Sequence, residues 1–356
     1  METTHYFEMK ELAKKNEVYC FCMQFNEMKN RFVKDGIHYI GVAKASTYEL
    51  YTEKGTRSIA LARRFARALP GALENYSFDL VYANSFPYLH LKAVKAYCKA
   101  YCKAYRCRLA LDVAEVWDIN RWKDYIGKFK GVAAYHYARN ALKGAYAYTA
   151  NSSATAKELE KAGIPKSRIT VLSPVIELEK MLKVSKQLRK LPVATYAGRL
   201  IKEKRLDLWV ESVAEAHMLD HRIKGLIIGS GPEEANVRKL IKKYHFITMR
   251  KPYSSKAQLY KAVGSATCML NMSERERFSI IAIESVALGT IPVLPDYTPI
   301  PEEVKTLSIV KSVKDIPKVI ASIASERIKY RVERQKLERF DVGCVDEAFE
   351  NIIIRG

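Results

Sequence analysis

Residues 276–292 read ERFSIIAIESVALGTIP, and most of this stretch has the pattern of a short apolar helix. If it is helical, Glu284 shares a face with residues that are all apolar, namely Ile280, Ile281, Ala287 and Leu288. A carboxylate on such a face is expected to be buried, and burial of an unpaired charge costs several kcal/mol. We therefore expect Glu284 to accept hydrogen bonds from donors that the neighbouring side chains do not supply.

The residues before this helix indicate what those donors are. Ser279 is a good N-cap residue, so we expect the helix to begin just after Phe278 and to leave its first backbone N–H groups unpaired. Such a helix start attracts phosphate. Glu276 lies just before the helix, so a ligand with an anionic group held there could place hydroxyls on both Glu276 and Glu284. Sugar hydroxyls are donors of this kind.

Two further segments supply positive charge and a tight backbone turn. Arg199 ends the expected strand PVATYAGR and Lys204 follows it, so both side chains can point into one cleft and neutralise a diphosphate. Gly229 and Gly231, in IIGSGPEE, form a strand-to-helix turn that lets the backbone approach a ligand. Taken alone, Arg199 could equally form a surface ion pair and Lys204 could be solvated.

Strand-like and helical patterns alternate along most of the chain, which is typical of parallel α/β folds. The strands expected in the first half are residues 17–25, 37–43, 78–85, 108–114, 145–151 and 169–174. Those expected in the second half are residues 192–199, 223–232, 246–249 and 267–272. The charged segment 177–191 carries no strand signal, so we expect a hinge there between two open sheets that face each other across a cleft.

Composition limits the class of protein. The 356 residues are 48% hydrophobic and 28% charged, which suits two packed domains, and no apolar run reaches the ~20 residues of a membrane helix. The N-terminal residues lack a signal peptide's apolar centre, and the seven cysteines show neither zinc-site nor disulfide spacing. We expect an intracellular, cytoplasmic protein with free thiols. A net charge of +21 favours anionic partners: phosphorylated small molecules, an acidic membrane surface or nucleic acid.

The ordered motifs GR, EK, IIGSGP, the two glutamates of residues 276–284 and ALGTIPV resemble the donor-binding domain of retaining glycosyltransferases of family 4. The resemblance runs through residues 193–300 and implies the GT-B fold, in which two Rossmann-like domains face across a cleft. It also implies that the enzyme transfers a sugar, of the hexosyl type, from a UDP- or GDP-sugar to a lipid, glycan or protein acceptor.

By that resemblance, each site residue has a role. Arg199 and Lys204 would bind the donor diphosphate, and Glu284 would bind the ribose hydroxyls. Glu276 would contact the donor sugar, while the backbone amides of Phe278 and Ser279 would hold phosphate oxygens. The family usually has glycine where this chain has Ser279. Gly229 and Gly231 belong to the same donor-binding set.

The first half resembles the family less closely. The segment LALDVAEVWD is similar to the turn that places a carboxylate near the reaction centre in part of the family, and Glu115 occupies that place. Glu115 could instead pair with Arg121 or Lys123. We expect an acceptor-side domain over residues 1–176 that begins at the family's first helix, without the opening strand and its glycine-rich turn.

The remaining boundaries follow from the same resemblance. After the hinge at residues 177–191, we expect the donor domain over residues 192–335 and a final helix over residues 336–356 that crosses back to the first domain. No DxD carboxylate pair occurs in the sequence, so we expect neither a metal nor another cofactor. Positive side chains and the helix dipole would instead stabilise the departing diphosphate.

A basic helix over residues 92–108 has several interpretations. Its basic residues recur every three or four positions beside a row of tyrosines, in the order Lys92, Lys95, Tyr97, Lys99, Tyr101, Lys103, Tyr105 and Arg106. This pattern suits an anionic membrane surface, at the inner face of the membrane, or a nucleic-acid backbone. It also suits a solvated helix that packs its tyrosines and cysteines inward.

Two other classes of function therefore stay open beside the enzyme. The charge of +21 allows a nucleic-acid-binding or DNA-modifying protein of the same fold, which a steep salt dependence of binding would reveal. The missing opening strand allows a catalytically silent, membrane-associated scaffold. Liposome flotation combined with nucleotide-sugar turnover would separate that scaffold from a peripheral enzyme.

Overall fold

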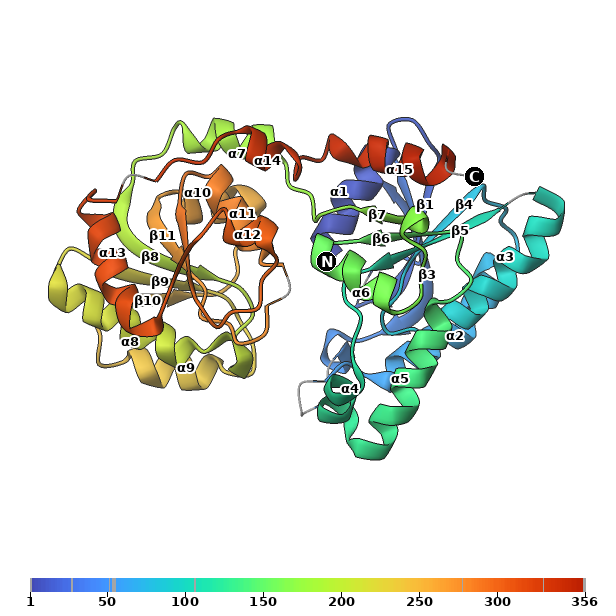
Figure 1. Ribbon diagram of the computed structural model, residues 1–356, viewed down its shortest axis with the longest axis horizontal. Coiled ribbons are helices and arrows are strands. Elements are labelled where there is room, and N and C mark those ends of the chain that lie inside the picture. The colour runs from blue at the N-terminus through green and yellow to red at the C-terminus, as the bar shows by residue number, and fades with distance from the viewer. Residues whose placement is uncertain are drawn as a thin grey trace. The chain divides into compact units, whose positions relative to one another are not determined.

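The computed structural model describes residues 2–26, 28–50, 52, 56–105, 107–276, 278–328 and 330–354. The chain forms two compact units (Figure 1). Unit 1 runs to Val175 and takes up the chain again from Val342, and unit 2 consists of Ile176–Asp341. The polypeptide therefore passes between the two units at two places, and unit 2 is a single continuous segment.

Unit 1 alternates strands and helices. Its elements are α1 (Glu2–Leu12), β1 (Val18–Phe25), β2 (Arg31–Lys34), β3 (Ile37–Ala45), η1 (Thr47–Leu50), α2 (Ile59–Leu73), β4 (Leu80–Asn84), α3 (Leu91–Tyr105), β5 (Arg108–Val113), α4 (Ile119–Ile126), α5 (Lys128–Leu142), β6 (Ala147–Ala150), α6 (Ser153–Lys161), η2 (Lys166–Arg168), β7 (Ile169–Val171) and α15 (Cys344–Ile354). Strands β4, β5, β6 and β7 form a parallel sheet in that order. A second sheet has the order β1-β3-β2, with β1 parallel and β2 antiparallel to β3.

Unit 2 is a doubly wound α/β structure. Its elements are α7 (Leu178–Ser185), β8 (Leu191–Ala197), η3 (Lys202–Lys204), α8 (Leu206–Leu219), β9 (Lys224–Ile228), α9 (Glu234–Ile241), β10 (Ile247–Arg250), α10 (Lys256–Gly264), β11 (Ala266–Leu270), α11 (Ile280–Ala287), β12 (Ile291–Pro295), α12 (Glu302–Lys305), β13 (Ile309–Lys311), η4 (Val313–Asp315), α13 (Ile316–Ala324) and α14 (Gln335–Glu338). Six parallel strands form one sheet in the order β10-β9-β8-β11-β12-β13.

Local sequence explains where several helices begin. The side chains of Ser58, Asp118, Ser152 and Ser255 each accept a hydrogen bond from the backbone N–H three residues later, at the starts of α2, α4, α6 and α10. These contacts satisfy N–H groups that have no partner within the helix.

The α/β prediction is confirmed, and most expected strands are found within a residue or two of their predicted ends. Strand β2 was not expected, because its four residues, RFVK, show no clear alternation and are mostly exposed. It pairs with β3 as a hairpin. Within the described residues, we find no helix with both the length and the apolar character that crossing a bilayer demands.

The expected hinge differs from what the structure shows. Residues 177–191 contain helix α7, and this segment belongs to unit 2. Leu178 and Met181, three positions apart, are fully buried in its core, and Glu179 pairs with Arg334 next to α14. Figure 1 shows α7 and α14 side by side. The charged residues of the segment belong to a helix whose apolar face is packed in the core. Their number therefore led to the incorrect prediction of a linker.

Helix α3 does not present one uniform basic stripe. Lys92 and Lys99 are exposed, but Lys95 turns inward and donates hydrogen bonds of 2.6 Å to the backbone oxygens of Ala141 and Lys143 at the end of α5. Tyr97 is buried and donates to the oxygen of Tyr76 at 2.7 Å. The expectation of a continuous stripe is thus wrong at Lys95. The side chains of residues 101–106 lie outside the described residues.

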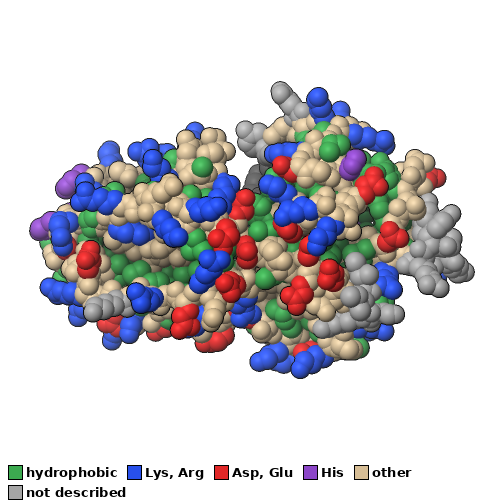
Figure 2. All heavy atoms as spheres, turned by 90° about the horizontal axis from the view of Figure 1, so that it is seen from above, with side chains coloured by type: hydrophobic (Ala, Val, Ile, Leu, Met, Phe, Trp, Pro, Cys, Tyr) green, Lys and Arg blue, Asp and Glu red, His purple; other side chains and the backbone are tan. Residues whose placement is uncertain are grey.

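Charge is mixed on the surface that Figure 2 displays. Lys and Arg side chains are spread over this face and are interspersed with Asp and Glu rather than gathered in one place.

Candidate functional site

The order of the strands in unit 2 indicates where a ligand would bind. From β8 the chain builds outward through β9 and β10, and then returns to place β11 on the other side of β8. The connections after β8 and β11 therefore leave the sheet in opposite directions. In open parallel sheets, ligands bind beyond the carboxyl ends of the strands at such a switch point. Lys204 follows β8, and Glu276 follows β11.

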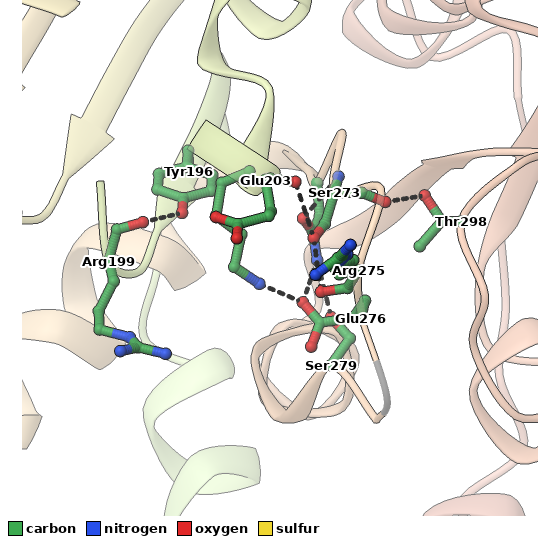
Figure 3. A network of polar contacts seen from close by, with 10 residues as sticks. Tyr196, Arg199, Glu203, Ser273, Arg275, Glu276, Ser279 and Thr298 are labelled. Atoms are coloured by element: carbon green, nitrogen blue, oxygen red, sulfur yellow. Dashed lines mark hydrogen bonds and ion pairs between the residues drawn. The ribbon is translucent and has the colours of Figure 1, made fainter. Parts of the chain in front are cut away.

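Hydrogen bonds join these two connections. The N–H of Glu274 donates to the backbone oxygen of Glu203 at 2.9 Å, and the Ser273 hydroxyl donates to the same oxygen at 3.3 Å. Thr298 in turn donates to the backbone oxygen of Ser273 at 2.8 Å. Figure 3 shows this network beside Glu276. It fixes the turn that carries Lys204 against the loop that carries Glu276.

The Glu276 carboxylate accepts hydrogen bonds from three directions. Lys204 Nζ lies 2.6 Å and Asn271 Nδ2 lies 3.0 Å from its Oε2, and the backbone N–H of Ser279 also donates to it. Burial alone would raise the pKa of Glu276, but Lys204, Asn271 and the Ser279 amide together lower it. The start of α11 and Lys204 thus bind an anion in this structure, and the anion belongs to the chain itself.

Ser279 does not cap the helix as expected. Its side chain makes no capping hydrogen bond, and its backbone lies in the left-handed region with φ 42° and ψ 66°. The hydroxyl instead accepts a hydrogen bond of 3.1 Å from Asn271 Nδ2. Glycine adopts this conformation most easily. The chain therefore keeps a glycine-type backbone path at this position although the residue is serine.

Phe278 precedes Ser279 and is buried in the core of unit 2, where its ring packs against Phe340 with centroids 6.0 Å apart. This contact anchors the start of α11. Only the backbone of Phe278 remains for binding a ligand.

Arg199 is placed apart from this network. Its backbone oxygen accepts a hydrogen bond of 2.8 Å from the Tyr196 hydroxyl, and its residue is exposed. Figure 3 shows its side chain extending to one side of Glu276 and Ser279 rather than into their network. The structure therefore brings Lys204 into contact with the carboxylate beside the start of α11, whereas the Arg199 side chain points to one side of it.

Gly229 and Gly231 shape the neighbouring edge of the sheet. A Cβ atom on Gly229 would lie 2.1 Å from the backbone oxygen of Gly198, and one on Gly231 would lie 2.4 Å from that of Leu200. We expected these glycines to allow a ligand close to the backbone. In the structure they allow the turn after β9 to lie against the residues that flank Arg199.

Glu284 is buried, as its position in the sequence predicts, but its partner was not foreseen. Its side chain is 8% exposed, and Lys256 Nζ at the start of α10 lies 3.1 Å from its Oε1. We expected sugar hydroxyls to be the donors to this carboxylate, and the structure shows an internal lysine that already pairs with it. Burial still raises the pKa of Glu284, and the attraction of Lys256 only partly offsets this effect.

Glu115 lies in unit 1 and pairs with Arg121, whose Nη2 is 2.7 Å from Glu115 Oε2. The guanidinium of Arg121 also lies 4.5 Å from the centre of the Trp117 ring. This is the structural alternative considered for Glu115 from the sequence.

Sequence reasoning missed Asn271 and Lys256. Asn271 is buried at the end of β11, where polar residues often face a ligand, and this position was the available signal. Lys256 is separated from Glu284 by 28 positions, and no local pattern connects them. In the described part of the chain, no cluster of three or more His, Cys, Asp or Glu side chains has the geometry of a metal site.

Two family models match the chain. One, described as Glycosyltransferase Family 4, covers residues 2–180, and the other, described as Glycosyl transferases group 1, covers residues 179–336. A search of the curated proteins finds no match.

Solved structures share the fold at low sequence identity. The protein HepE from Anabaena in complex with UDP-glucose is 12% identical, with a TM-score of 0.67 over 98% of this chain and 94% of that one. An alpha,alpha-trehalose-phosphate synthase (UDP-forming) from Burkholderia xenovorans is 10% identical, with a TM-score of 0.71 over 99% and 95%. The apo lipopolysaccharide outer core galactosyltransferase WaaB is 16% identical, with a TM-score of 0.63 over 99% and 94%.

Proposed function

The chain belongs to glycosyltransferase family 4 and has the GT-B fold, and we propose that it is a retaining enzyme that transfers a hexosyl group from a nucleotide-diphosphate sugar. The observation that carries this proposal is the anion site at the switch point of unit 2. There Lys204 and the Ser279 N–H converge on one carboxylate.

The donor diphosphate would take the place that the Glu276 carboxylate now occupies. Lys204 and the amides at the start of α11 are the groups that phosphate prefers at a helix N-terminus. The exposed side chain of Arg199, on the loop after β8, would add a second cation once the ligand is bound. Glu276, released from Lys204, would then accept hydrogen bonds from the sugar hydroxyls.

The nucleoside would lie further along α11. Glu284 lies in the second turn of α11, beyond the helix start where the phosphates would bind. Its carboxylate has acceptor positions beyond the one that Lys256 uses. We propose that the ribose hydroxyls donate to it. UDP is the first nucleotide to test, because HepE was solved with UDP-glucose.

The transfer would proceed without a protein nucleophile. The bond between the anomeric carbon and the diphosphate oxygen breaks, and the acceptor oxygen bonds to the same face of that carbon. The acceptor's proton passes to the departing diphosphate, whose charge Lys204, Arg199 and the helix dipole stabilise. Because these groups supply the positive charge, we propose that the reaction needs no metal ion or other cofactor.

The acceptor in this proposal is a lipid, a glycan or a protein. Glu115 in unit 1 is the carboxylate that the family resemblance brings near the reaction centre. We propose it as a weaker candidate than Glu276, because its partner Arg121 belongs to no anion site in the described part of the chain, whereas Glu276 lies among groups that suit a phosphate. The exposed Lys92 and Lys99 of α3 would suit a lipid acceptor at an anionic membrane surface in the cytoplasm.

Donor binding and turnover by the purified protein test this function. A panel of UDP-, GDP- and ADP-sugars should contain one that raises the melting temperature, since a ligand that binds only the folded state stabilises it. Release of the nucleotide from that donor should continue in EDTA. The anomeric signal of the product in proton NMR should show retention. Unchanged turnover in both Arg199→Ala and Glu284→Ala would contradict the assignment of the site.

A further inference from the structure

Lys256 pairs with Glu284, the residue that we propose binds the ribose. It is the first residue of α10, directly after the N-cap Ser255, and its side chain is 35% exposed. Its Nζ lies 3.1 Å from Oε1 of Glu284 and 5.6 Å from the centre of the Tyr260 ring. The ammonium group is thus held between a carboxylate and an aromatic face while it still reaches solvent.

The surroundings of Glu284 contain few other charges. Helix α11 packs against α7 and β12, and α10 packs against the same helix α7. Strand β12 carries no titratable side chain. The groups that face Glu284 from α10 are Lys256 and Tyr260, and Glu177 at the start of α7 also lies near Tyr260. Tyr260 is buried, and its hydroxyl has no hydrogen-bond partner among the described residues. Of these groups, Lys256 carries the positive charge.

From this geometry we propose that Lys256 is a positioning residue for the nucleotide, which holds the Glu284 carboxylate ionised and oriented to accept the ribose hydroxyls. The inference rests on the proposed function, because it gives Glu284 the ribose as its ligand. It extends that function by identifying the group that keeps a buried acceptor usable at neutral pH.

An ionised carboxylate accepts hydrogen bonds only, whereas a protonated one loses acceptor capacity and gains a donor. Two ribose hydroxyls that both donate therefore need the ionised form. Burial favours the protonated form of Glu284 and raises its pKa, and Lys256 opposes this shift. Without Lys256, the carboxyl group would remain protonated to a higher pH and would bind the ribose poorly there.

The binding constant for UDP-glucose, measured by calorimetry across pH, tests this role. UDP-glucose is the probe because its diphosphate is a diester and does not titrate near neutral pH, unlike the terminal phosphate of UDP. If the wild type prefers GDP- or ADP-glucose, that sugar nucleotide replaces it. The variants are Lys256→Met, Lys256→Arg, Glu284→Gln and the double variant. Lys261→Met is the matched control, because Lys261 lies on the same helix and is exposed.

We expect Lys256→Met to weaken UDP-glucose binding about tenfold near pH 6, because protonated Glu284 would lose one hydrogen bond from the ribose, and such a bond to a charged group contributes about this much. The loss should be smaller near pH 8, where more of the carboxylate is ionised. Lys256→Arg should restore most of the affinity and a pH profile close to that of the wild type. In the Glu284→Gln background, Lys256→Met should have no further effect, because Lys256 acts through Glu284. The double variant also removes both charges, so it remains informative if an unpaired Glu284 destabilises the single variant.

Other outcomes overturn the inference. A pH-independent loss in Lys256→Met that persists in the Glu284→Gln background would show that Lys256 contacts the ligand directly. Affinity equal to that of Lys261→Met would show that it has no role. If the wild type binds no nucleotide sugar at all, the proposed function itself fails, and this result is separate from both others.

Discussion

Glu276, just before α11, and Glu284, in the second turn of that helix, each pair with a different lysine, and their pKa values shift in opposite directions. Glu276 receives hydrogen bonds from Lys204, Asn271 and a backbone amide, and its pKa is lowered despite burial. Glu284 receives one from Lys256, and burial raises its pKa. The lysine has the largest opposing effect on both carboxylates, but Lys204 lies closer to Glu276 than Lys256 does to Glu284, and only Glu276 has two further donors. The closer cation and the additional donors together account for the lowered pKa of Glu276.

This difference also separates two ways of binding a donor. Glu276 accepts hydrogen bonds from Lys204 and the Ser279 amide, so a ligand that binds these two groups must displace its carboxylate. Glu284 has unused acceptor positions, so a ligand can add to it without displacing Lys256. Variants of the residues at the two sites should distinguish these two modes of binding.

Removal of Lys204, the cation whose partner would change on donor binding, should have the greatest effect on turnover. Lys204→Met is expected to reduce donor turnover about 100-fold, since stabilising charge on the departing diphosphate contributes about 2.7–4 kcal/mol in comparable sites. Steady-state release of the nucleotide measures this effect. Lys202→Met is the control, because Lys202 lies in the same turn and is exposed. Equal turnover in the two variants would place the diphosphate elsewhere.

A smaller but structural effect is expected at the turn after β9. Gly229→Ala puts a Cβ atom 2.1 Å from the oxygen of Gly198, so the loop that carries Arg199 must move. We expect a loss of about 1–3 kcal/mol in the free energy of unfolding, measured by chemical denaturation. Gly71→Ala is the matched control, because a Cβ atom there meets nothing within 4 Å. Similar stability in both variants would show that the turn is loosely packed.

Substitution of Glu284 should weaken ligand binding without lowering the stability of the protein. Glu284→Gln is expected to weaken nucleotide-sugar binding by about 1.5 kcal/mol, the contribution of a hydrogen bond to a charged group. It should leave stability at neutral pH unchanged or slightly higher, because the raised pKa means that the ionised carboxylate costs free energy in the folded state. Calorimetry and thermal unfolding measure the two quantities. A large loss of stability with normal binding would make Glu284 a structural residue.

The two carboxylates should also affect stability in opposite directions with pH. The lowered pKa of Glu276 means that its contribution to stability is present above its unfolded pKa of about 4.5 and is lost as pH falls toward the folded value. The raised pKa of Glu284 means that its contribution falls as pH rises from about 4.5 toward the folded value. Unfolding curves of Glu276→Gln and Glu284→Gln between pH 3 and pH 7 should therefore deviate from the wild type with opposite slopes. Parallel slopes would contradict the assigned difference.

The smallest effect is expected at Ser279. Ser279→Gly should raise stability by up to about 1 kcal/mol, because φ is 42° and glycine adopts this conformation without steric cost. The lost hydrogen bond from Asn271 partly opposes the gain. Ser279→Ala keeps the strain and loses the same hydrogen bond, so it should be less stable than wild type. The reverse order of the two variants would mean that the hydroxyl matters more than the backbone.

The sequence was sufficient for the fold because strand and helix patterns are local. Short apolar runs between helical stretches identified β8, β9 and β11, and the motifs at their ends identified Lys204 and Glu276. Residues 177–191 misled because their charges obscured the three-residue spacing of Leu178 and Met181. Such a segment is read correctly only when its packing partner is known.

The partners of the buried carboxylates could not be predicted in the same way. Lys256 reaches Glu284 because α10 and α11 both pack against α7, and no periodicity in the sequence reveals this tertiary arrangement. The backbone of Ser279 follows from the loop that joins it to Asn271, and that loop overrides the usual capping preference of serine. The sequence was therefore sufficient to identify the charged residues of the site, but their pairing depends on the tertiary structure.

Donor binding at this site requires Lys204 to exchange the Glu276 carboxylate for a phosphate, and a crystal structure with a bound nucleoside diphosphate tests this exchange most directly. We predict a phosphate oxygen within hydrogen-bond distance of Lys204 Nζ and of the Ser279 amide, with the Glu276 carboxylate no longer bonded to either. A nucleotide bound at another place, with Lys204 and Glu276 still paired, would contradict the account.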